Sequence, residues 1–411
     1  MDEKHVLIIG GGAAGLVAAI AAARNGARVT VLEKMDRVGK KILATGNGRC
    51  NFTNINMDLK FFHGNNVKFA QGILEDFNLE QCINFFEYLG IAHKVEEEGR
   101  VFPRSDQASS LLNVLRYELN KLGIREECNR QVVAIHKKGD KFHLHLKNGQ
   151  IIKGDRVVVA TGGRAAPQLG SMGEGHKLAE KLGHRITKVF PALVQLKLEA
   201  DFLRRIQGVK FKGLASLALD NRILRQERGE ILFTNYGISG PPILQLSRGA
   251  AEELLKGNKP QLLLDIYPDF TRDELLDLIN IRRAYQPQKN LEFSFVGLIN
   301  NRLIPVILKE AGIEDSNIKS AQVSNKELAN IVDILKEWTL TISGTQSWQN
   351  AQTTGGGVDV DQIDSKSLQS KLVKGLYFAG EVVDIDGDCG GYNLQWAWSS
   401  GYVAGEEAAK D

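Results

Sequence analysis

The sequence predicts an α/β fold whose parallel sheet is built from both ends of the chain. Near the N-terminus, the apolar run 5–9 leads directly into the glycine-rich turn Gly10–Gly15. Near the C-terminus, the apolar run 376–379 leads into Gly380-Glu381, and a third buried strand is expected at 156–161. Because ligands of such sheets collect at the carboxyl ends of the strands, these segments predict one shared binding site.

The first turn has the spacing G-x-G-x-x-G between an expected strand and an expected helix. In this arrangement Gly10 makes the tight turn, Gly12 lets the backbone approach a pyrophosphate, and Gly15 lets the helix pack against the strand. The unpaired N–H groups at the helix N-terminus then face the phosphates. The pattern indicates a Rossmann-like dinucleotide-binding unit.

The following residues complete this unit. Residues 16–24 are alanine-rich and apolar and predict a helix, which Asn25-Gly26 ends. A second strand is expected at 27–32 and ends in Glu33, where an acceptor for a ribose hydroxyl is expected. The alternative for Glu33 is a solvated charge at a strand end.

Composition is that of an ordinary soluble protein. The 411 residues are 43% hydrophobic and 25% charged, and the formal net charge is +3. We therefore expect a cytoplasmic protein with no membrane span and no general attraction to nucleic acid. The four cysteines lack C-x-x-C spacing, so we expect no metal site and no disulfide framework. They are Cys50, Cys82, Cys128 and Cys389.

Residues 39–54 form a polar segment with regularly placed glycines. Small residues allow backbone amides to approach a ligand, and Lys40, Lys41 and Arg49 could offset phosphate charge. A surface loop with scattered charge is the alternative.

The middle of the first domain is expected to contain helices and a meander. Helical patterns cover 65–89 and 107–122, and a helix is expected at 176–182. Three β segments separated by turn residues predict a three-stranded antiparallel meander. These segments are 131–137, 141–147 and 150–153.

From about residue 191, short alternating β segments and then helical patterns replace the pattern of the first domain, which predicts an insertion. We expect a discontinuous dinucleotide-binding domain (1–190 and 350–411), a β-rich substrate domain (191–267 and 337–349) and a helical domain (268–336). β segments are expected at 194–198, 215–219, 230–234 and 261–266, and a helix at 243–254. The insertion also carries a basic cluster with interleaved acids, which indicates a solvated face or a surface for an anionic substrate or RNA. The basic residues are Arg204, Arg205, Lys210, Lys212, Arg222, Arg225 and Arg228.

The C-terminal segment resembles the second half of an FAD site. An acid after a strand-end glycine accepts a hydrogen bond from the ribityl chain in such proteins, and Glu381 has that place here. The last helix is expected to begin at 391–393 and to run to Ala409, with its N-terminal amides facing the pyrimidine end of the flavin. A side chain at Gly390 or Gly391 would hold the backbone away from the ring.

Four blocks make a specific resemblance: residues 48–54 (GRCNFTN), 160–163 (ATGG), 239–241 (SGP) and 390–395 (GGYNLQ). They resemble the signature blocks of a bacterial family of NAD(P)/FAD-dependent oxidoreductases, which includes aminoacetone oxidase and a bile-acid-inducible 3-dehydro-bile-acid reductase. The resemblance runs over nearly the whole chain. It implies a two-part FAD domain interrupted by a β-barrel-like unit and a helical unit.

The resemblance also implies which residues bind FAD. They are Gly10, Gly12, Ala13, Ala14, Gly15, Glu33, Lys34, Lys41, Thr45, Gly46, Asn47, Gly48, Arg49, Cys50, Asn51, Val132, Ala160, Thr161, Gly162, Gly380, Glu381, Gly391, Tyr392, Asn393 and Leu394.

No catalytic acid, base or nucleophile is assigned. Tyr392 and Arg49 could touch the substrate or support residues that do. Many members of the family have histidine at the position of Asn235, and asparagine cannot exchange protons near neutral pH.

These observations predict an FAD-dependent oxidoreductase that transfers a hydride between flavin N5 and a small organic substrate. The reaction is either oxidation of an amine or reduction of an activated C=C bond. NADH or NADPH is a candidate electron donor, although no second G-x-G-x-x-G unit accompanies the first. An RNA-modifying flavoprotein and a flavin-binding sensor without turnover are the alternatives, and the oligomeric state stays open.

Overall fold

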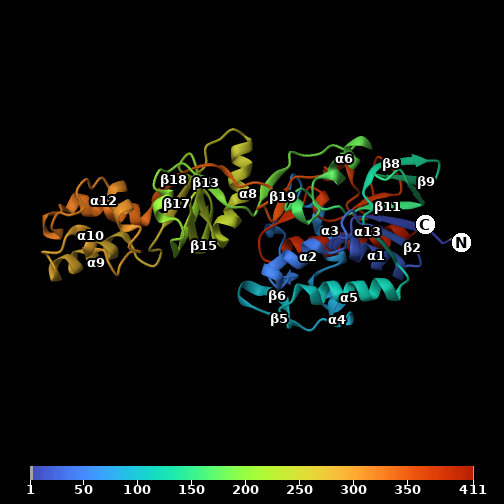
Figure 1. Cartoon of the computed structure of the whole chain (residues 1–411), viewed down its shortest axis with the longest axis horizontal. Coiled ribbons are helices and arrows are strands. Elements are labelled where there is room, and N and C mark those ends of the chain that lie inside the picture. Colours follow the sequence, from blue (N-terminus) through green and yellow to red (C-terminus); the bar gives the residue numbers. More distant parts are fainter. Residues whose placement is uncertain (1–2, 411) are drawn as a thin grey trace. The chain divides into compact units, whose positions relative to one another are not determined.

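A five-stranded parallel sheet forms the centre of the first of two compact units (Figure 1). The computed structural model describes residues 3–410. The first unit extends to Pro191 and resumes at Ala351, and the second is Ala192–Asn350. The sheet order β20-β11-β1-β2-β7 places β1 and β20, which come from the two ends of the chain, two places apart in one doubly wound sheet. The strands are β1 (His5–Ile9), β2 (Arg28–Leu32), β7 (Arg125–Glu127), β11 (Arg156–Val159) and β20 (Leu376–Phe378).

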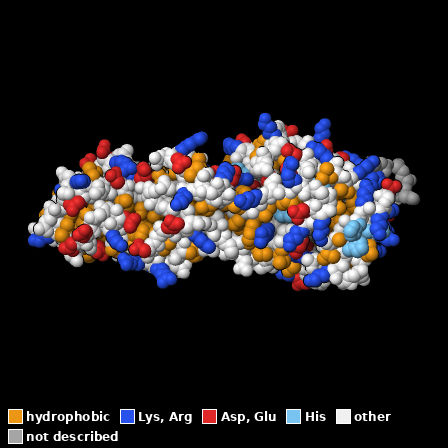
Figure 2. All heavy atoms as spheres, turned by 90° about the horizontal axis from the view of Figure 1, so that it is seen from above, with side chains coloured by type: hydrophobic (Ala, Val, Ile, Leu, Met, Phe, Trp, Pro, Cys, Tyr) orange, Lys and Arg blue, Asp and Glu red, His pale blue; other side chains and the backbone are white. Residues whose placement is uncertain are grey.

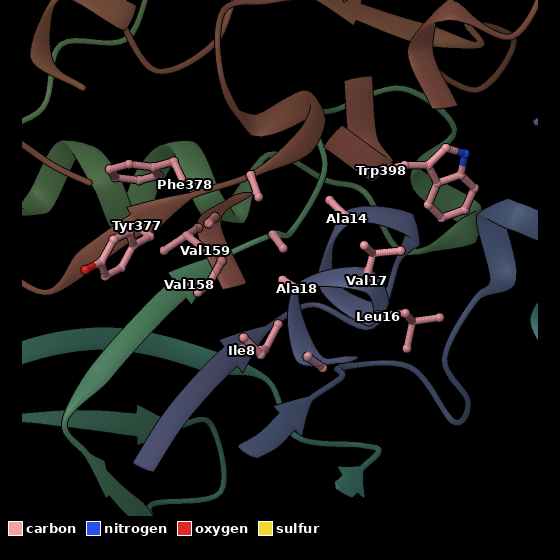
Figure 3. Packing of buried hydrophobic residues seen from close by; sticks show 14 of the residues in the cluster. Ile8, Ala14, Leu16, Val17, Ala18, Val158, Val159, Tyr377, Phe378 and Trp398 are labelled. Carbon is pink, nitrogen blue, oxygen red and sulfur yellow. The ribbon is translucent and has the colours of Figure 1, made fainter. Parts of the chain in front are cut away.

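Two helices from opposite ends of the chain pack closely against each other in this unit. They are α1 (Ala13–Arg24) and α13 (Tyr392–Ala409). A Cβ on Gly401 would lie 2.3 Å from the carbonyl oxygen of Ala14, and one on Gly405 would lie 2.1 Å from that of Ala18. Glycine in α13 therefore lets the two backbones touch. Figure 3 shows Ala14 and Ala18 of α1 near the buried side chains of β1, β11 and β20.

The remaining elements of the first unit surround this centre. The predicted meander is present as a separate three-stranded sheet. It consists of β8 (Val132–Lys138), β9 (Lys141–Leu146) and β10 (Ile151–Gly154). The larger helices are α2 (Lys40–Ala44), α3 (Phe69–Asp76), α4 (Leu79–Tyr88), α5 (Ala108–Lys121) and α6 (Glu174–Lys181). Short strands form small sheets: β3 (Thr53–Asn54), β5 (His93–Val95) and β6 (Arg100–Pro103); β4 (Phe62–His63) and β21 (Asp386–Gly387); β12 (Phe190–Ala192) and β19 (Thr353–Gly355).

The helical segment predicted at 65–89 is two helices rather than one. The first ends at Asp76, and Asn78 begins the second because its side chain accepts a hydrogen bond from the backbone N–H of Gln81. The Gln81 side chain in turn accepts one from the N–H of Asn78. This reciprocal capping box starts α4 and separates it from α3.

The second unit contains a closed six-stranded antiparallel barrel, which confirms the predicted β-barrel-like insertion. The barrel order is β13-β16-β15-β14-β17-β18. The strands are β13 (Leu196–Leu198), β14 (Lys210–Leu219), β15 (Arg222–Thr234), β16 (Gly237–Ser239), β17 (Gln261–Asp265) and β18 (Trp338–Thr345). The helices of this unit are α7 (Leu203–Ile206), α8 (Pro241–Leu255), α9 (Arg272–Tyr285), α10 (Leu291–Ser294), α11 (Ile304–Glu310) and α12 (Asn325–Lys336). They share one hydrophobic core with the barrel.

Within residues 3–410, none of the helices is both long and apolar enough to cross a bilayer. The same residues contain no group of three or more His, Cys, Asp or Glu side chains arranged to hold a metal ion.

His184 gives the first unit a predictable dependence on pH. The side chain is buried, with Nε2 2.8 Å from Ser370 Oγ and Nδ1 3.2 Å from the Ala179 carbonyl oxygen. Burial lowers the pKa of His184 below its ordinary value of 6.5. The unfolded chain therefore takes up a proton at a higher pH than the native state does, so the free energy of unfolding falls as the pH drops below 6.5.

We expect His184→Asn to flatten the acid side of the stability curve. Urea unfolding of wild type and variant at several pH values from 7 to 5.5 measures the two slopes. The wild-type slope should be the steeper one, by up to one proton. Equal slopes would show that His184 has the same proton affinity in both states.

Candidate FAD site

A large cavity in the first unit is lined by residues from both ends of the chain. It encloses about 980 Å³, part of which is open to solvent. Its wall includes the β1–α1 turn, α2, the residues after β11 and β20, and the first turns of α13. A second cavity of about 390 Å³ shares Gly10, Glu33, Thr161 and Gly170 with it. The carboxyl edge of the sheet thus carries two adjoining cavities.

The three motif glycines have three different environments. Gly10 has φ of +104°, and a Cβ there would lie 2.5 Å from the carbonyl oxygen of Ala160. A Cβ on Gly15 would lie 1.9 Å from the carbonyl oxygen of Gly10. A Cβ on Gly12, in contrast, would meet no heavy atom of residues 3–410 within 4 Å. Gly10 and Gly15 are therefore required by the fold, whereas at Gly12 the protein itself leaves room.

The N-terminus of α1 has the chemistry of an anion site. Gly12 is its N-cap residue, and no side chain within the described part of the chain caps the helix there. Gly12, Ala13 and Ala14 line the large cavity. Uncapped N–H groups and the positive end of the helix dipole suit a pyrophosphate, so these residues fit FAD.

Glu33 presents an oriented carboxylate to both cavities. Its Oε2 accepts a hydrogen bond of 2.8 Å from the N–H of Gly11, and its Oε1 accepts one of 2.8 Å from the N–H of Met35. A carboxylate held by two backbone donors is fixed in place and keeps lone pairs for a ligand hydroxyl.

Glu381 is the second carboxylate of the large cavity. It lies in η7 (Gly380–Val382), directly after β20. Its Oε2 is 2.7 Å from Lys41 Nζ, and its Oε1 accepts a hydrogen bond of 2.8 Å from the N–H of Thr354. Asn393, at the start of α13, is linked to the same wall because its Oδ1 accepts from Thr353 Oγ1 at 3.1 Å and from the N–H of Gly387 at 2.9 Å.

The glycine-rich block after α2 is held by the protein itself. Arg49 forms ion pairs of 2.5 Å with Glu96 and with Asp106, and its guanidinium lies 4.2 Å from the centre of the Phe102 ring. These two carboxylates raise the pKa of Arg49. Asn51 Oδ1 accepts a hydrogen bond from the N–H of Val101. In this structure the Arg49 charge is therefore offset by carboxylates rather than directed into either cavity.

Cys50 has no features of a reactive thiol. Its side chain is fully buried, and burial raises its pKa to about 12. Because the thiolate is the nucleophilic form, Cys50 is inert near neutral pH.

Tyr392 is a packed aromatic residue. Its ring stacks on Phe61 with 4.6 Å between the ring centres, and its hydroxyl donates to the carbonyl oxygen of Asn56 at 3.5 Å. Burial raises the pKa of Tyr392 to about 12. The two preceding glycines also have backbone reasons, since φ is +129° at Gly390 and +103° at Gly391, and a Cβ on Gly391 would lie 2.5 Å from the carbonyl oxygen of Thr53.

The structure brings most of the expected FAD-binding residues together. Those that line the large cavity are Gly10, Gly12, Ala13, Ala14, Glu33, Lys41, Thr45, Ala160, Thr161, Gly162, Gly380, Glu381, Asn393 and Leu394. Lys34 and Val132 line the second cavity. Nine others lie outside the walls of both cavities as the described residues form them: Gly15, Gly46, Asn47, Gly48, Arg49, Cys50, Asn51, Gly391 and Tyr392. Asn235 is exposed in the turn between β15 and β16 of the second unit.

Several cavity residues were missed by sequence reasoning. Trp396 and Ala397 follow Asn393 by three and four positions and lie on the same face of α13, a spacing that could have revealed them. Gly170 and Ser171 lie in the glycine-rich segment that precedes α6. The others are Gly11, Met35, Arg37, Gly39, Ile42, Leu169, Gln352, Thr353, Ala379 and Ile385. Lys40, which the sequence indicated as a possible partner of phosphate, also lines this cavity.

Comparison with known proteins agrees with this architecture. Residues 4–407 match the family described as "HI0933-like protein Rossmann domain". The chain is 38% identical over 409 residues to a 3-dehydro-bile acid delta(4,6)-reductase from Clostridium scindens, covering 99% of each chain. It is 30% identical over 412 residues to a ribosomal RNA dihydrouridine synthase from Escherichia coli, covering 99% of this chain and 98% of that protein.

A solved structure shares the fold over the full length of both chains. It is a 3-ketosteroid delta1-dehydrogenase from Sterolibacterium denitrificans, with a TM-score of 0.52 and 13% identity. The match of the family model to nearly the whole chain confirms the resemblance inferred from the four blocks. This protein belongs to the HI0933-like family of bacterial FAD-dependent oxidoreductases.

Proposed function

We propose that this protein is an FAD-dependent reductase that delivers a hydride to a C=C bond conjugated to a carbonyl group. The observation that carries the proposal is the cavity in which the β1–α1 turn, Glu33 and Glu381 converge. Oxidised steroids and uridine share a conjugated C=C bond, and the full-length relatives are named for reduction of a bile acid and for synthesis of dihydrouridine. Both names therefore support reduction of a C=C bond over oxidation of an amine.

We assign the chain's own residues the following roles. The backbone at Gly12 and the N-terminus of α1 hold the pyrophosphate, Glu33 accepts from the adenosine ribose, and Glu381 accepts from the ribityl chain. FAD, when bound, supplies hydride chemistry that no side chain can supply. The residues around it fix its position, neutralise its charge and exclude water.

We also propose that different segments of the chain bind the cofactor and the substrate. The domain formed by 1–190 and 350–411 binds the cofactor. The β-rich segment 191–267 with 337–349 and the helical segment 268–336 supply substrate contacts. A small unsaturated steroid or bile acid is the substrate class that the most similar of these relatives supports.

A second candidate is reduction of a uracil in ribosomal RNA. The relative from Escherichia coli favours it, and so do the basic residues of the insertion. Against it, several of those cations are paired: Lys210 with Glu230 at 3.0 Å, and Arg228 with Asp269 at 2.6 Å. Figure 2 likewise shows basic and acidic side chains interspersed over most of the face that it draws. Neutralised cations contribute little to phosphate binding.

Anaerobic reoxidation of the reduced flavin distinguishes these functions. FAD-loaded protein is photoreduced and mixed separately with a 3-keto-4,6-diene steroid, with its saturated 3-keto counterpart, and with unmodified ribosomal RNA. We expect the flavin absorbance to return only with the diene, together with a product that has gained two hydrogens. Dihydrouridine formed from the RNA, with no reaction of the diene, would replace the small-molecule assignment. A flavin that no acceptor reoxidises would favour a sensor.

The electron donor is tested separately. NADH and NADPH are each added to the oxidised protein in the absence of oxygen. Prompt bleaching by one of them identifies the donor. An unbleached flavin would mean that another reductant feeds this protein.

A further inference from the structure

Lys41 and Glu381 connect the two ends of the chain inside the cofactor cavity. Lys41 lies in α2, and Glu381 follows the last strand of the sheet. Both line the large cavity, and their side chains are mostly buried, with exposed fractions of 27% and 19%. Lys41 Nζ is 2.7 Å from Glu381 Oε2. At this distance, and with limited solvent, the pair is a charge-assisted hydrogen bond rather than a screened surface contact.

The surroundings fix this ion pair in one orientation. The other oxygen of Glu381 accepts from the N–H of Thr354 at 2.8 Å. Thr354 is itself held, because its Oγ1 accepts from the N–H groups of Arg164 at 2.8 Å and Ala165 at 3.0 Å. The Lys41 ammonium is therefore anchored through a carboxylate whose second oxygen is already occupied.

The neighbouring lysine has a different partner. Lys40 also lines the cavity, but its Nζ pairs at 2.5 Å with Asp36, whose side chain is 66% exposed. The two residues carry the same charge on the same short helix and differ in what holds them. Substituting either lysine removes one positive charge, but only substitution of Lys41 removes a cation that is held by a mostly buried partner. Comparing the two variants therefore separates the effect of an anchored cation from that of total charge.

We propose that Lys41 is a positioning residue that holds the Glu381 carboxylate and offsets its negative charge in the cofactor cavity, raising the reduction potential of bound FAD. Uptake of a hydride adds two electrons and one proton to the isoalloxazine, so the reduced ring carries one more negative charge than the oxidised ring. An unpaired carboxylate in a cavity of low dielectric constant would oppose that added charge, and the Lys41 ammonium removes this opposition. The inference rests on the proposed FAD site and is independent of which acceptor the enzyme reduces.

The test is the midpoint potential of bound FAD in the absence of any acceptor. Wild type, Lys41→Met, Lys41→Arg and Lys40→Met are titrated against a reference dye during slow anaerobic reduction. We expect Lys41→Met to shift the ratio of reduced to oxidised flavin at least tenfold toward the oxidised form, which is about 30 mV for two electrons. Lys41→Arg and Lys40→Met should each stay within threefold of wild type.

Repeating the Lys41→Met substitution in a Glu381→Gln variant shows whether Lys41 acts through Glu381. In Glu381→Gln the ammonium loses its anchor, so adding Lys41→Met should change the ratio less than threefold. An undiminished tenfold effect there, an equal shift in Lys40→Met, or a wild-type potential in Lys41→Met would each overturn the proposal. A wild-type protein that binds no FAD would overturn it together with the cofactor assignment, whereas a normal titration without C=C reduction would contradict only the proposed reaction.

Discussion

Gly12→Ala should abolish most FAD binding while leaving the protein folded. The new methyl group meets no heavy atom within 4 Å among the described residues, yet it stands on the backbone that lines the cofactor cavity. We expect the dissociation constant of FAD to rise about 100-fold, equivalent to about 2.7 kcal/mol. The free energy of unfolding of the FAD-free protein should change by less than about 1 kcal/mol, as expected for a changed N-cap residue. Flavin fluorescence titration and urea unfolding measure the two quantities.

Gly15→Ala is the matched control on the same turn. Its Cβ would lie 1.9 Å from the carbonyl oxygen of Gly10, so it should destabilise the FAD-free protein as well as weaken binding. If Gly12→Ala binds FAD as wild type does, the pyrophosphate does not lie against this turn.

Gly405→Ala should destabilise the first unit by about 1–3 kcal/mol through overpacking. The added Cβ would lie 2.1 Å from the carbonyl oxygen of Ala18, so α13 must move away from α1. Because these helices come from the two ends of the chain, the movement also disturbs the cavity that both ends line. Urea unfolding measures the loss of stability, and FAD titration measures the accompanying loss of affinity.

Gly72→Ala provides the comparison within a helix. A Cβ there would lie 3.8 Å from the carbonyl oxygen of Ser365, which is an ordinary contact. Alanine is the better helix former by up to about 1 kcal/mol, so this variant should be slightly more stable than wild type. Equal stabilisation by Gly72→Ala and Gly405→Ala would show that α1 and α13 are not closely packed.

The elements at the two ends of the chain could be predicted because their signals are local. An apolar run before Gly10 and another before Gly380 each predict a buried strand, and the structure has β1 and β20 there. The last helix begins at Tyr392, within the predicted range 391–393. Strand β15 could be predicted only in part. Its first half, 222–229, is mostly exposed and polar, so the sequence there lacks the alternation of apolar and polar residues that indicates a half-buried strand.

Barrel closure depends on pairs that no local pattern contains. β13 pairs with β18, so that Leu196 lies opposite Thr345. The sequence predicted a β-rich insertion from alternating residues, but it held no information on which strands pair. The resemblance implied a β-barrel-like unit, but the number and order of its strands came only from the structure.

The same difference between local and long-range signals determines which cavity residues could be predicted. Cavity residues that belong to glycine-rich motifs, such as Gly12 and Gly162, could be predicted, because such motifs encode backbone shape. The partners of charged side chains could not be predicted, because Arg49 pairs with Glu96 and Asp106 from distant segments. The assignment of individual residues to FAD binding stays a prediction.

Titration of the purified, FAD-free protein with FAD under anaerobic conditions tests whether this cavity is the cofactor site. We expect one FAD bound per chain, with an oxidised flavin spectrum that is perturbed on binding and a dissociation constant that Gly12→Ala raises about 100-fold. A correctly folded wild-type protein that takes up no FAD, or one whose affinity is the same in Gly12→Ala, would contradict the assignment of this cavity as the cofactor site.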